Sequence, residues 1–186
     1  MSDTATTLPK TTEVKKPRLM MTKIVAGYLL LLLLLAMLFV VTSLISASSQ
    51  LPLMRYVSMA IMIPLMILGG GFAMLKPWYL AAIVFQPVFP ILFLIFRSSW
   101  LQFMGMMYHL VMAGFMMVVA CECFYYYSHF DELEKNDNPG ILEIFALFQG
   151  GMSISNAVVY IGFAVMLFFD VRKQKKYRLL SGEFGW

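Results

Sequence analysis

Long apolar segments separated by short polar stretches dominate the pattern along the chain. A helix needs about 20 apolar residues to cross the hydrocarbon layer of a membrane, which is about 30 Å thick. Five segments reach or approach that length, and none alternates apolar and polar residues as the strands of a membrane β-barrel do. The pattern predicts an all-α membrane protein, a polytopic helical bundle over residues 23–171. The segments are Ile24–Ile45, Tyr56–Leu75, Trp78–Phe96, Leu101–Phe124 and about Ile144–Phe169.

Polar sequences flank and interrupt this helical domain. Residues 1–22 are basic and rich in Thr, which predicts a disordered tail. Residues 172–186 form a second basic tail, and residues 128–143 form an acidic loop before the last segment. The first apolar segment has 22 residues, whereas the apolar part of a cleaved signal peptide has about 7–15. We therefore expect it to be retained as the first membrane helix.

The segment Trp78–Phe96 differs from the others because Pro87 and Pro90 lie near its centre. Proline removes a hydrogen-bond donor and clashes with the preceding helical turn. We therefore expect a break at Gln86-Pro87 and a re-entrant segment that dips into the membrane and returns to the same side. The alternative is a kinked helix that crosses completely, which gives five full spans.

The positions of Lys and Arg favour the first arrangement, because these residues accumulate on the cytosolic side. Five spans would place seven of the fourteen Lys and Arg on each side. Four spans plus a dip at Trp78–Phe96 would place twelve of them inside, together with both tails, and a dip at Tyr56–Leu75 would place eleven inside. We expect four spans with both termini in the cytosol, in the plasma membrane or an endomembrane.

Composition agrees with a membrane protein, since 61% of the residues are hydrophobic and 13% are charged. Soluble domains have about 45–50% apolar and about 25% charged residues. A nucleic-acid partner is not expected, because no soluble folded face carries a basic groove. The sequence contains no phosphate-binding loop, zinc-protease motif or serine-hydrolase elbow. We therefore expect a protein that is not an enzyme and that needs no cofactor or metal.

Three polar side chains within the apolar segments are functional candidates, because ionisable and polar groups are costly inside a bilayer. They are Gln86, His109 and Glu122. An interhelical hydrogen bond is the simpler role for His109, and a proton relay is the alternative. Glu122 shares a helical face with Tyr126 and His129, which indicates either an interfacial aromatic belt or a pH-responsive cluster.

Small residues mark one face of the last segment. Gly151, Ser155 and Gly162 are spaced for close packing against another helix, and the neighbouring face is small as well. The spacing predicts helix packing but does not distinguish a partner helix in this chain from one in another chain.

The C-terminal tail holds two further candidates. Tyr177 and Leu180 fit the Tyr-x-x-apolar form of a cytosolic sorting signal; otherwise they end an amphipathic stretch beside the membrane. The neighbouring basic run is expected to contact anionic lipids by charge. Its members are Arg172, Lys173, Lys175, Lys176 and Arg178.

Together these features predict a small multi-pass membrane protein that acts as a non-enzymatic scaffold, trafficking or accessory subunit. Its expected partners are anionic cytosolic lipids and either other membrane proteins or further copies of itself. The alternative is a small oligomeric transporter or channel. A membrane-embedded enzyme is a third class, for which the sequence offers no catalytic set.

Overall fold

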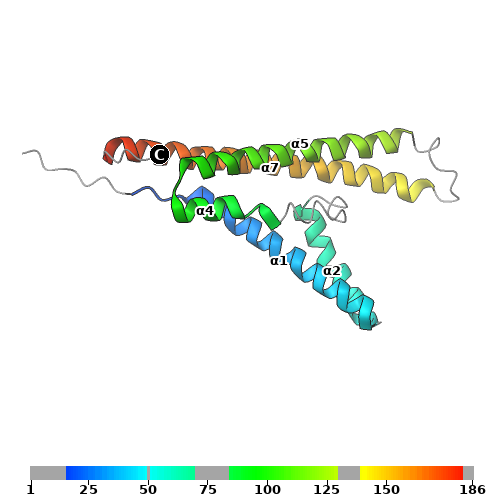
Figure 1. The fold of residues 1–186 in the computed structure, drawn as a ribbon. Helices are drawn as coiled ribbons and strands as arrows, with labels where there is room; N and C mark the ends of the chain where they lie inside the picture. Colours follow the sequence, from blue (N-terminus) through cyan, green and yellow to red (C-terminus); the bar gives the residue numbers. More distant parts are fainter. Residues whose placement is uncertain (1–15, 50, 70–83, 130–138, 182–186) are drawn as a thin grey trace, which may run out of the picture.

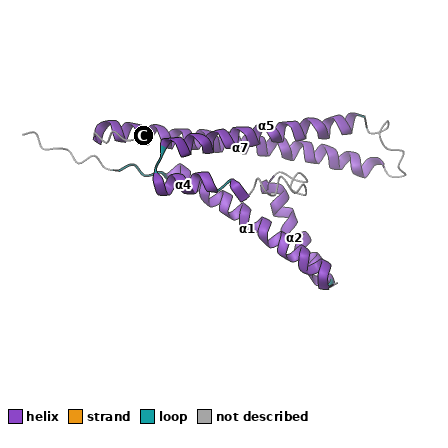
Figure 2. Ribbon diagram, in the orientation of Figure 1, coloured by secondary structure: helices purple, strands orange, loops and turns teal. Residues whose placement is uncertain are grey.

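The computed structural model describes residues 16–49, 51–69, 84–129 and 139–181. Within these residues every regular element is an α-helix, which confirms the all-α prediction for this part of the chain (Figures 1 and 2). The helices are α1 (Met20–Ser49), α2 (Pro52–Gly69), α4 (Val88–Phe96), α5 (Ser99–Ser128) and α7 (Pro139–Ser181).

Three helices, α1, α5 and α7, are long and apolar enough to cross a membrane. A helix of 30 residues, the length of α1 and of α5, is about 45 Å long, which exceeds the hydrocarbon thickness. The apolar part of α2 is shorter and covers Pro52–Leu65. These lengths support a membrane-embedded protein, and the count of four spans plus a dip stays a prediction.

The helix ends differ from the predicted boundaries at both tails. α1 begins at Met20, three residues before the predicted start at 23. α7 does not end at 171 but continues through the basic run to Ser181. Lys and Arg form helices well and interact favourably with the negative end of the helix dipole. Parts of the predicted tails, the acidic loop and the segments Tyr56–Leu75 and Trp78–Phe96 lie outside the described residues, at 1–15, 70–83, 130–138 and 182–186.

The expected break at Gln86-Pro87 is present as a turn that precedes α4. The N–H of Ile91 donates to the carbonyl of Pro87 at 3.1 Å, so the new helix starts directly after the break. α4 has nine residues and is therefore about 13 Å long, less than half of the hydrocarbon thickness. It ends at Arg97, which has a left-handed backbone conformation with φ of 51°.

α5 and α7 lie side by side and run in opposite directions (Figure 1). Their buried positions alternate in steps of three and four residues, the spacing of a coiled-coil seam. On α5 the buried positions are Gln102, Gly105, His109, Met112, Met116 and Val119. On α7 they are Gln149, Ser153, Asn156, Tyr160, Phe163, Leu167, Asp170 and Gln174.

α1 and α2 form a hairpin whose far end diverges from the α5–α7 pair (Figure 1). The hydroxyl of Tyr28 donates to the carbonyl of Leu68 at 2.8 Å, and the hydroxyls of Ser43 and Ser58 lie 2.7 Å apart. Nearer its start, α1 packs its buried Leu29 and Leu32 into a core shared with α5 and α7. The hairpin is therefore joined to the pair mainly through the first half of α1.

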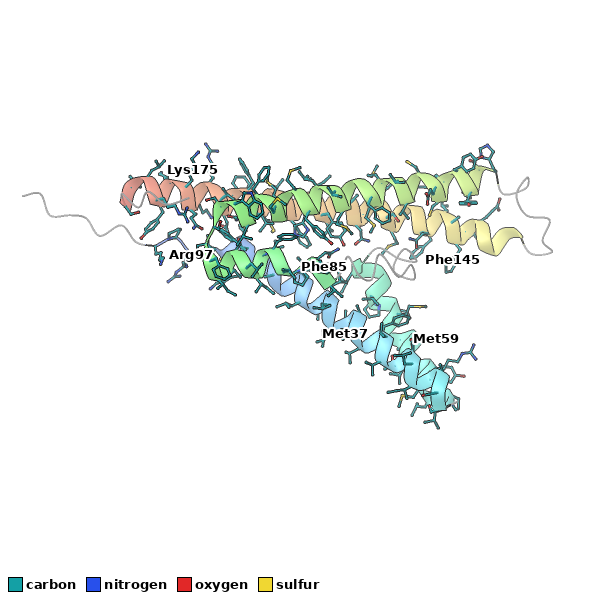
Figure 3. The ribbon with its side chains drawn as sticks, viewed as in Figure 1. Met37, Met59, Phe85, Arg97, Phe145 and Lys175 are labelled. Atoms are coloured by element: carbon teal, nitrogen blue, oxygen red, sulfur yellow. The ribbon has the colours of Figure 1, made fainter. Side chains whose placement is uncertain are left out.

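Large apolar side chains cover the outer surfaces of the helices. Met37, Met59, Phe85 and Phe145, labelled in Figure 3, are all exposed. On α7 the exposed side chains include Val158, at 63% exposure, whereas its buried stripe is largely polar. This distribution is the reverse of that in a soluble helix and suits contact with lipid.

Two glycines of α5 allow a matched test of this packing. A Cβ at Gly105 would lie 3.1 Å from Cβ of Phe89 on α4, whereas a Cβ at Gly114 would meet nothing within 4 Å. Both substitutions to Ala gain the same helix propensity, so their difference reports crowding alone. We expect Gly105→Ala to be less stable than Gly114→Ala by about 1–3 kcal/mol in unfolding measured in detergent micelles. Equal stabilities would contradict the close approach of Phe89 to α5.

Candidate functional site

A line of buried polar side chains runs along the inner face of α7, and we call it the polar seam. Its α7 members extend over 25 residues, which corresponds to about 37 Å along the helix. This length exceeds the hydrocarbon thickness of a membrane, which is about 30 Å. The seam consists of Gln149, Ser153, Asn156, Tyr160, Asp170 and Gln174 on α7 together with Thr22, Gln86, Gln102 and His109.

The middle of the seam joins the break before α4 to α7. The amide of Gln86 donates to the hydroxyl of Tyr160 at 2.8 Å, and both side chains are buried. The turn at Gln86-Pro87 places this amide inside the bundle. A polar hydrogen bond here fixes the irregular backbone against α7, as backbone at membrane depth requires.

His109 lies beside this bond in an aromatic surrounding. Its ring stacks on Tyr160 at a centroid distance of 6.1 Å and meets Phe163 edge-on at 5.6 Å. In the part of the chain that the structure describes, neither ring nitrogen of His109 has a hydrogen-bond partner. Among the described residues, His109 therefore does not form the expected interhelical hydrogen bond, and its ring is positioned by contacts with aromatic rings. About two turns away along α5, the amide of Gln102 donates to the carbonyl of Leu167 at 2.8 Å and joins α5 to α7.

The carboxylate of Asp170 binds the first turn of α1. Its Oδ2 accepts hydrogen bonds from the backbone N–H and the hydroxyl of Thr22, each at 2.8 Å. The first N–H groups of a helix have no partner within the helix, and a negative charge there interacts favourably with the helix dipole. Lys173 lies on the outside, with Nζ 3.9 Å from Oδ1. Asp170 therefore acts as a cap for α1 supplied by another helix.

The link between α4 and α5 is attached to α7 at the same end. The carbonyl of Arg97 accepts hydrogen bonds from the amide of Gln174 at 2.6 Å and from the guanidinium of Arg178 at 2.8 Å. The start of α1, the end of α4, the start of α5 and the end of α7 thus lie together (Figure 1). Nine of the ten described Lys and Arg are at this end, with Arg55 the exception, and we call it the basic end.

The structure separates the three predicted intramembrane residues. Gln86 and His109 are fully buried and both lie by Tyr160, whereas Glu122 is exposed on α5. His129 stacks on Tyr125 with a centroid distance of 4.4 Å, and its Nδ1 lies 2.8 Å from the hydroxyl of Ser128. The described contacts of His129 are therefore with its own helix, and the predicted cluster around Glu122 stays a prediction.

The predicted packing residues of α7 are not covered by the other described helices. Gly151, Ser155 and Gly162 are exposed, and a Cβ at either glycine would meet nothing within 4 Å. Gly150, on the neighbouring face, is buried, and a Cβ there would lie 3.0 Å from the Phe124 ring. The face beside the predicted one therefore packs within this chain, and the packing of the predicted face against a helix of this chain or of another stays a prediction.

The candidates of the C-terminal tail lie on the last turns of α7. Tyr177 is half-buried and Leu180 is exposed, both within the helix. A sorting signal is recognised as an extended peptide, so these turns would have to unwind. Four of the basic residues are exposed and Arg178 is half-buried, which leaves the predicted lipid contact open to all of them. The exposed ones are Arg172, Lys173, Lys175 and Lys176.

The site includes residues that were not singled out from the sequence as candidates, among them Thr22, Arg97, Tyr160, Asp170 and Gln174. For the last three, the available signal was the spacing of polar residues on α7 in steps of three and four, which places them on one face. Hydropathy obscures this signal because apolar neighbours surround each polar residue.

The chemistry available in the seam is hydrogen bonding, with one imidazole and one carboxylate. Over residues 16–49, 51–69, 84–129 and 139–181, no group of three or more His, Cys, Asp or Glu is placed to hold a metal ion. The amides and hydroxyls join α4, α5 and α1 to α7, which is the role of polar side chains between membrane helices.

The cap on α1 can be tested at Asp170. Asp170→Ala removes both bonds and leaves a buried N–H of Thr22 without its carboxylate, so we expect a loss of about 1–3 kcal/mol of unfolding free energy. Thr22→Val removes only the hydroxyl bond and should cost about 0.5–1.5 kcal/mol. Lys173→Ala is the control, since its half-exposed ammonium lies 3.9 Å from the buried Oδ1 and should contribute less than the two 2.8 Å bonds of Oδ2. Thermal unfolding in micelles measures all three, and equal losses for Asp170→Ala and Lys173→Ala would contradict the cap.

The chain was compared with protein-family models, with curated proteins and with solved structures. No family model matches, and neither a curated protein nor a solved structure matches. A proposal for the role of the chain therefore depends on the geometry of its own side chains.

Proposed function

We propose that this chain is a multi-pass membrane protein that acts as a non-enzymatic scaffold, trafficking or accessory subunit in a membrane complex. The observation that carries the proposal is the open small face of α7, formed by Gly151, Ser155 and Gly162. Lipid gives membrane helices no hydrophobic drive to associate, so close backbone approach over small residues supplies much of the attraction. α7 already uses its inner face within the chain, which leaves this outer face for a helix of another chain.

The internal hydrogen bonds agree with a structural role. Gln86 joins the turn before α4 to α7, Gln102 joins α5 to α7, and Asp170 joins α7 to α1. Side chains used in this way hold the helices in a fixed arrangement. A fixed arrangement is what a scaffold needs in order to present one helix face to a partner.

Both termini are proposed to be cytosolic. The first turn of α1 and the last turns of α7 lie at the basic end, and cytosolic loops carry an excess of Lys and Arg. The basic end would then face the anionic inner leaflet, where each Lys or Arg near the surface contributes about 1 kcal/mol of attraction. A sorting role for Tyr177 and Leu180 is part of the same proposal, because such signals act in the cytosol.

Cross-linking through Ser155 tests the open face of α7. We expect Ser155→Cys, in a chain with Cys121 and Cys123 replaced by Ala, to give one discrete adduct with a short thiol-reactive cross-linker in native membranes. The adduct joins either two differently tagged copies or one copy and another membrane protein. Adding Gly151→Leu should reduce the adduct about tenfold by separating the backbones.

Gly114→Cys on the outer face of α5 is the matched control, since this position is exposed and has equally open space around it. It should give no discrete adduct. Equal cross-linking from both positions, or an adduct from Ser155→Cys that survives Gly151→Leu, would contradict a helix partner at this face.

A small oligomeric transporter or channel is the second candidate function. It is favoured by the polar seam, which lines up buried polar groups over the thickness of a membrane. His109 lies midway along the seam, and an imidazole can accept and release a proton near neutral pH.

Flux through purified protein in liposomes distinguishes the two functions. If the seam carries protons, the wild-type chain should dissipate an imposed pH gradient across the liposome membrane. His109→Ala should lower the rate of this dissipation at least about tenfold, because it removes an imidazole from the seam. His129→Ala is the control, since His129 lies outside the seam. Flux at the level of empty liposomes for the wild-type chain would rule out the transporter and leave the scaffold proposal unaffected.

A further inference from the structure

A cavity of about 330 Å³ opens at the basic end, between the start of the described chain, the end of α4 and the last turns of α7. Its lining includes Lys16, Ile95, Phe96, Arg97, Tyr177 and Arg178. The volume lies within the range of ligand pockets, about 300–1,000 Å³. The cavity is separate from the polar seam except at Gln174, which borders both.

The cavity gathers positive charge from three distant parts of the chain. Lys16 precedes α1, Arg97 links α4 to α5, and Arg178 lies on the last turns of α7. None of the described residues that line the cavity is acidic. The guanidinium of Arg178 also donates to the carbonyl of Arg97, and an anion in the cavity would interact favourably with all three positive charges.

The backbone conformation of Arg97 is fixed by hydrogen bonds to its carbonyl. The residue adopts a left-handed conformation that glycine adopts more easily, and the hydrogen bonds from Gln174 and Arg178 to its carbonyl fix it there. The position would be filled with less strain by glycine, yet it carries a guanidinium. The guanidinium offers five N–H donors in a planar fork that matches phosphate oxygens.

Exposed apolar side chains border the charged cavity. Ile95 and Phe96, the last two residues of α4, are 65% and 66% exposed and lie directly before Arg97. In Figure 3, Arg97 and Lys175 lie at the same end of the bundle, where the apolar helix surfaces end. Charge on one side and apolar surface on the other is the arrangement that a phospholipid at a membrane boundary requires.

We infer that this cavity binds the phosphate-bearing headgroup of one acidic phospholipid, with its acyl chains against Ile95 and Phe96. A headgroup carrying phosphomonoester groups, such as a phosphorylated inositol, suits three converging cations best, because it brings more than one negative charge. This site goes beyond the diffuse attraction of the basic run for anionic lipid. It does not depend on the scaffold role.

The test uses the full-length protein in detergent and counts bound lipids by native mass spectrometry. The probes are short-chain phosphatidylinositol 4-phosphate and, as the neutral reference, short-chain phosphatidylcholine. We expect one molecule of the acidic lipid to bind with preference over the neutral one. Arg97→Gly, which suits the left-handed backbone, and Lys16→Gln should each weaken that binding about tenfold, the effect of one charge-assisted contact. Arg97→Lys should weaken the binding less than Arg97→Gly does, because it keeps the positive charge but loses the planar fork of donors.

Lys175→Gln is the matched control, because it removes one charge from an exposed residue of the same basic end that does not line the cavity. It should change the binding less than twofold. If Lys175→Gln weakens binding as much as Arg97→Gly does, the attraction is diffuse and the cavity site is wrong, although the lipid contact stands. Equal binding of the two lipids would overturn headgroup recognition altogether. Displacement of the lipid by an equal concentration of inorganic phosphate would show that a free anion is the ligand and would also overturn the proposal.

Discussion

Three buried polar side chains connect separate parts of the chain to α7. The carboxylate of Asp170 binds α1, the amide of Gln86 joins the turn before α4 to α7, and the amide of Gln102 joins α5 to α7. Within hydrocarbon no water competes for these groups, so each polar side chain must find its partner inside the protein. The same constraint decides which face of each helix turns inward. On α7 the buried face holds polar residues together with apolar ones such as Phe163 and Leu167, and large apolar residues such as Val158 are exposed.

The same hydrogen bonds to α7 bring the residues of the basic end together. Because Asp170 caps α1 and α7 binds the carbonyl of Arg97, three chain segments that are far apart in sequence meet at one place. Nine of the ten described Lys and Arg are therefore collected at one end. The helical extension of α7 to Ser181 adds the basic run to that cluster instead of leaving it as a separate tail.

The sequence was sufficient for the class of the protein and for the break in the third apolar segment. Length and hydropathy identify helices such as α1 directly. Pro87 lacks a backbone N–H and disfavours the preceding helical turn, so a break before α4 was predictable, although Pro64 is accommodated inside α2. The partners of Gln86 and Asp170 were not, because they lie 74 and 148 residues away along the chain. Such a pairing depends on the register in which two helices pack. The spacing of residues within one helix does not determine that register.

The small residues of α7 also show that sequence spacing does not determine which helix face is packed. Gly150 and Gly151 are adjacent in sequence and equally small, yet one is covered by Phe124 and the other is open. Only the position of α5 distinguishes them. The open face at Gly151 lies in the first half of α7, whereas the lipid cavity lies at Arg97 by the last turns. Between them the hydrogen bonds of the seam hold the helices in register, so a partner helix and a bound lipid would occupy separate places on one rigid helix.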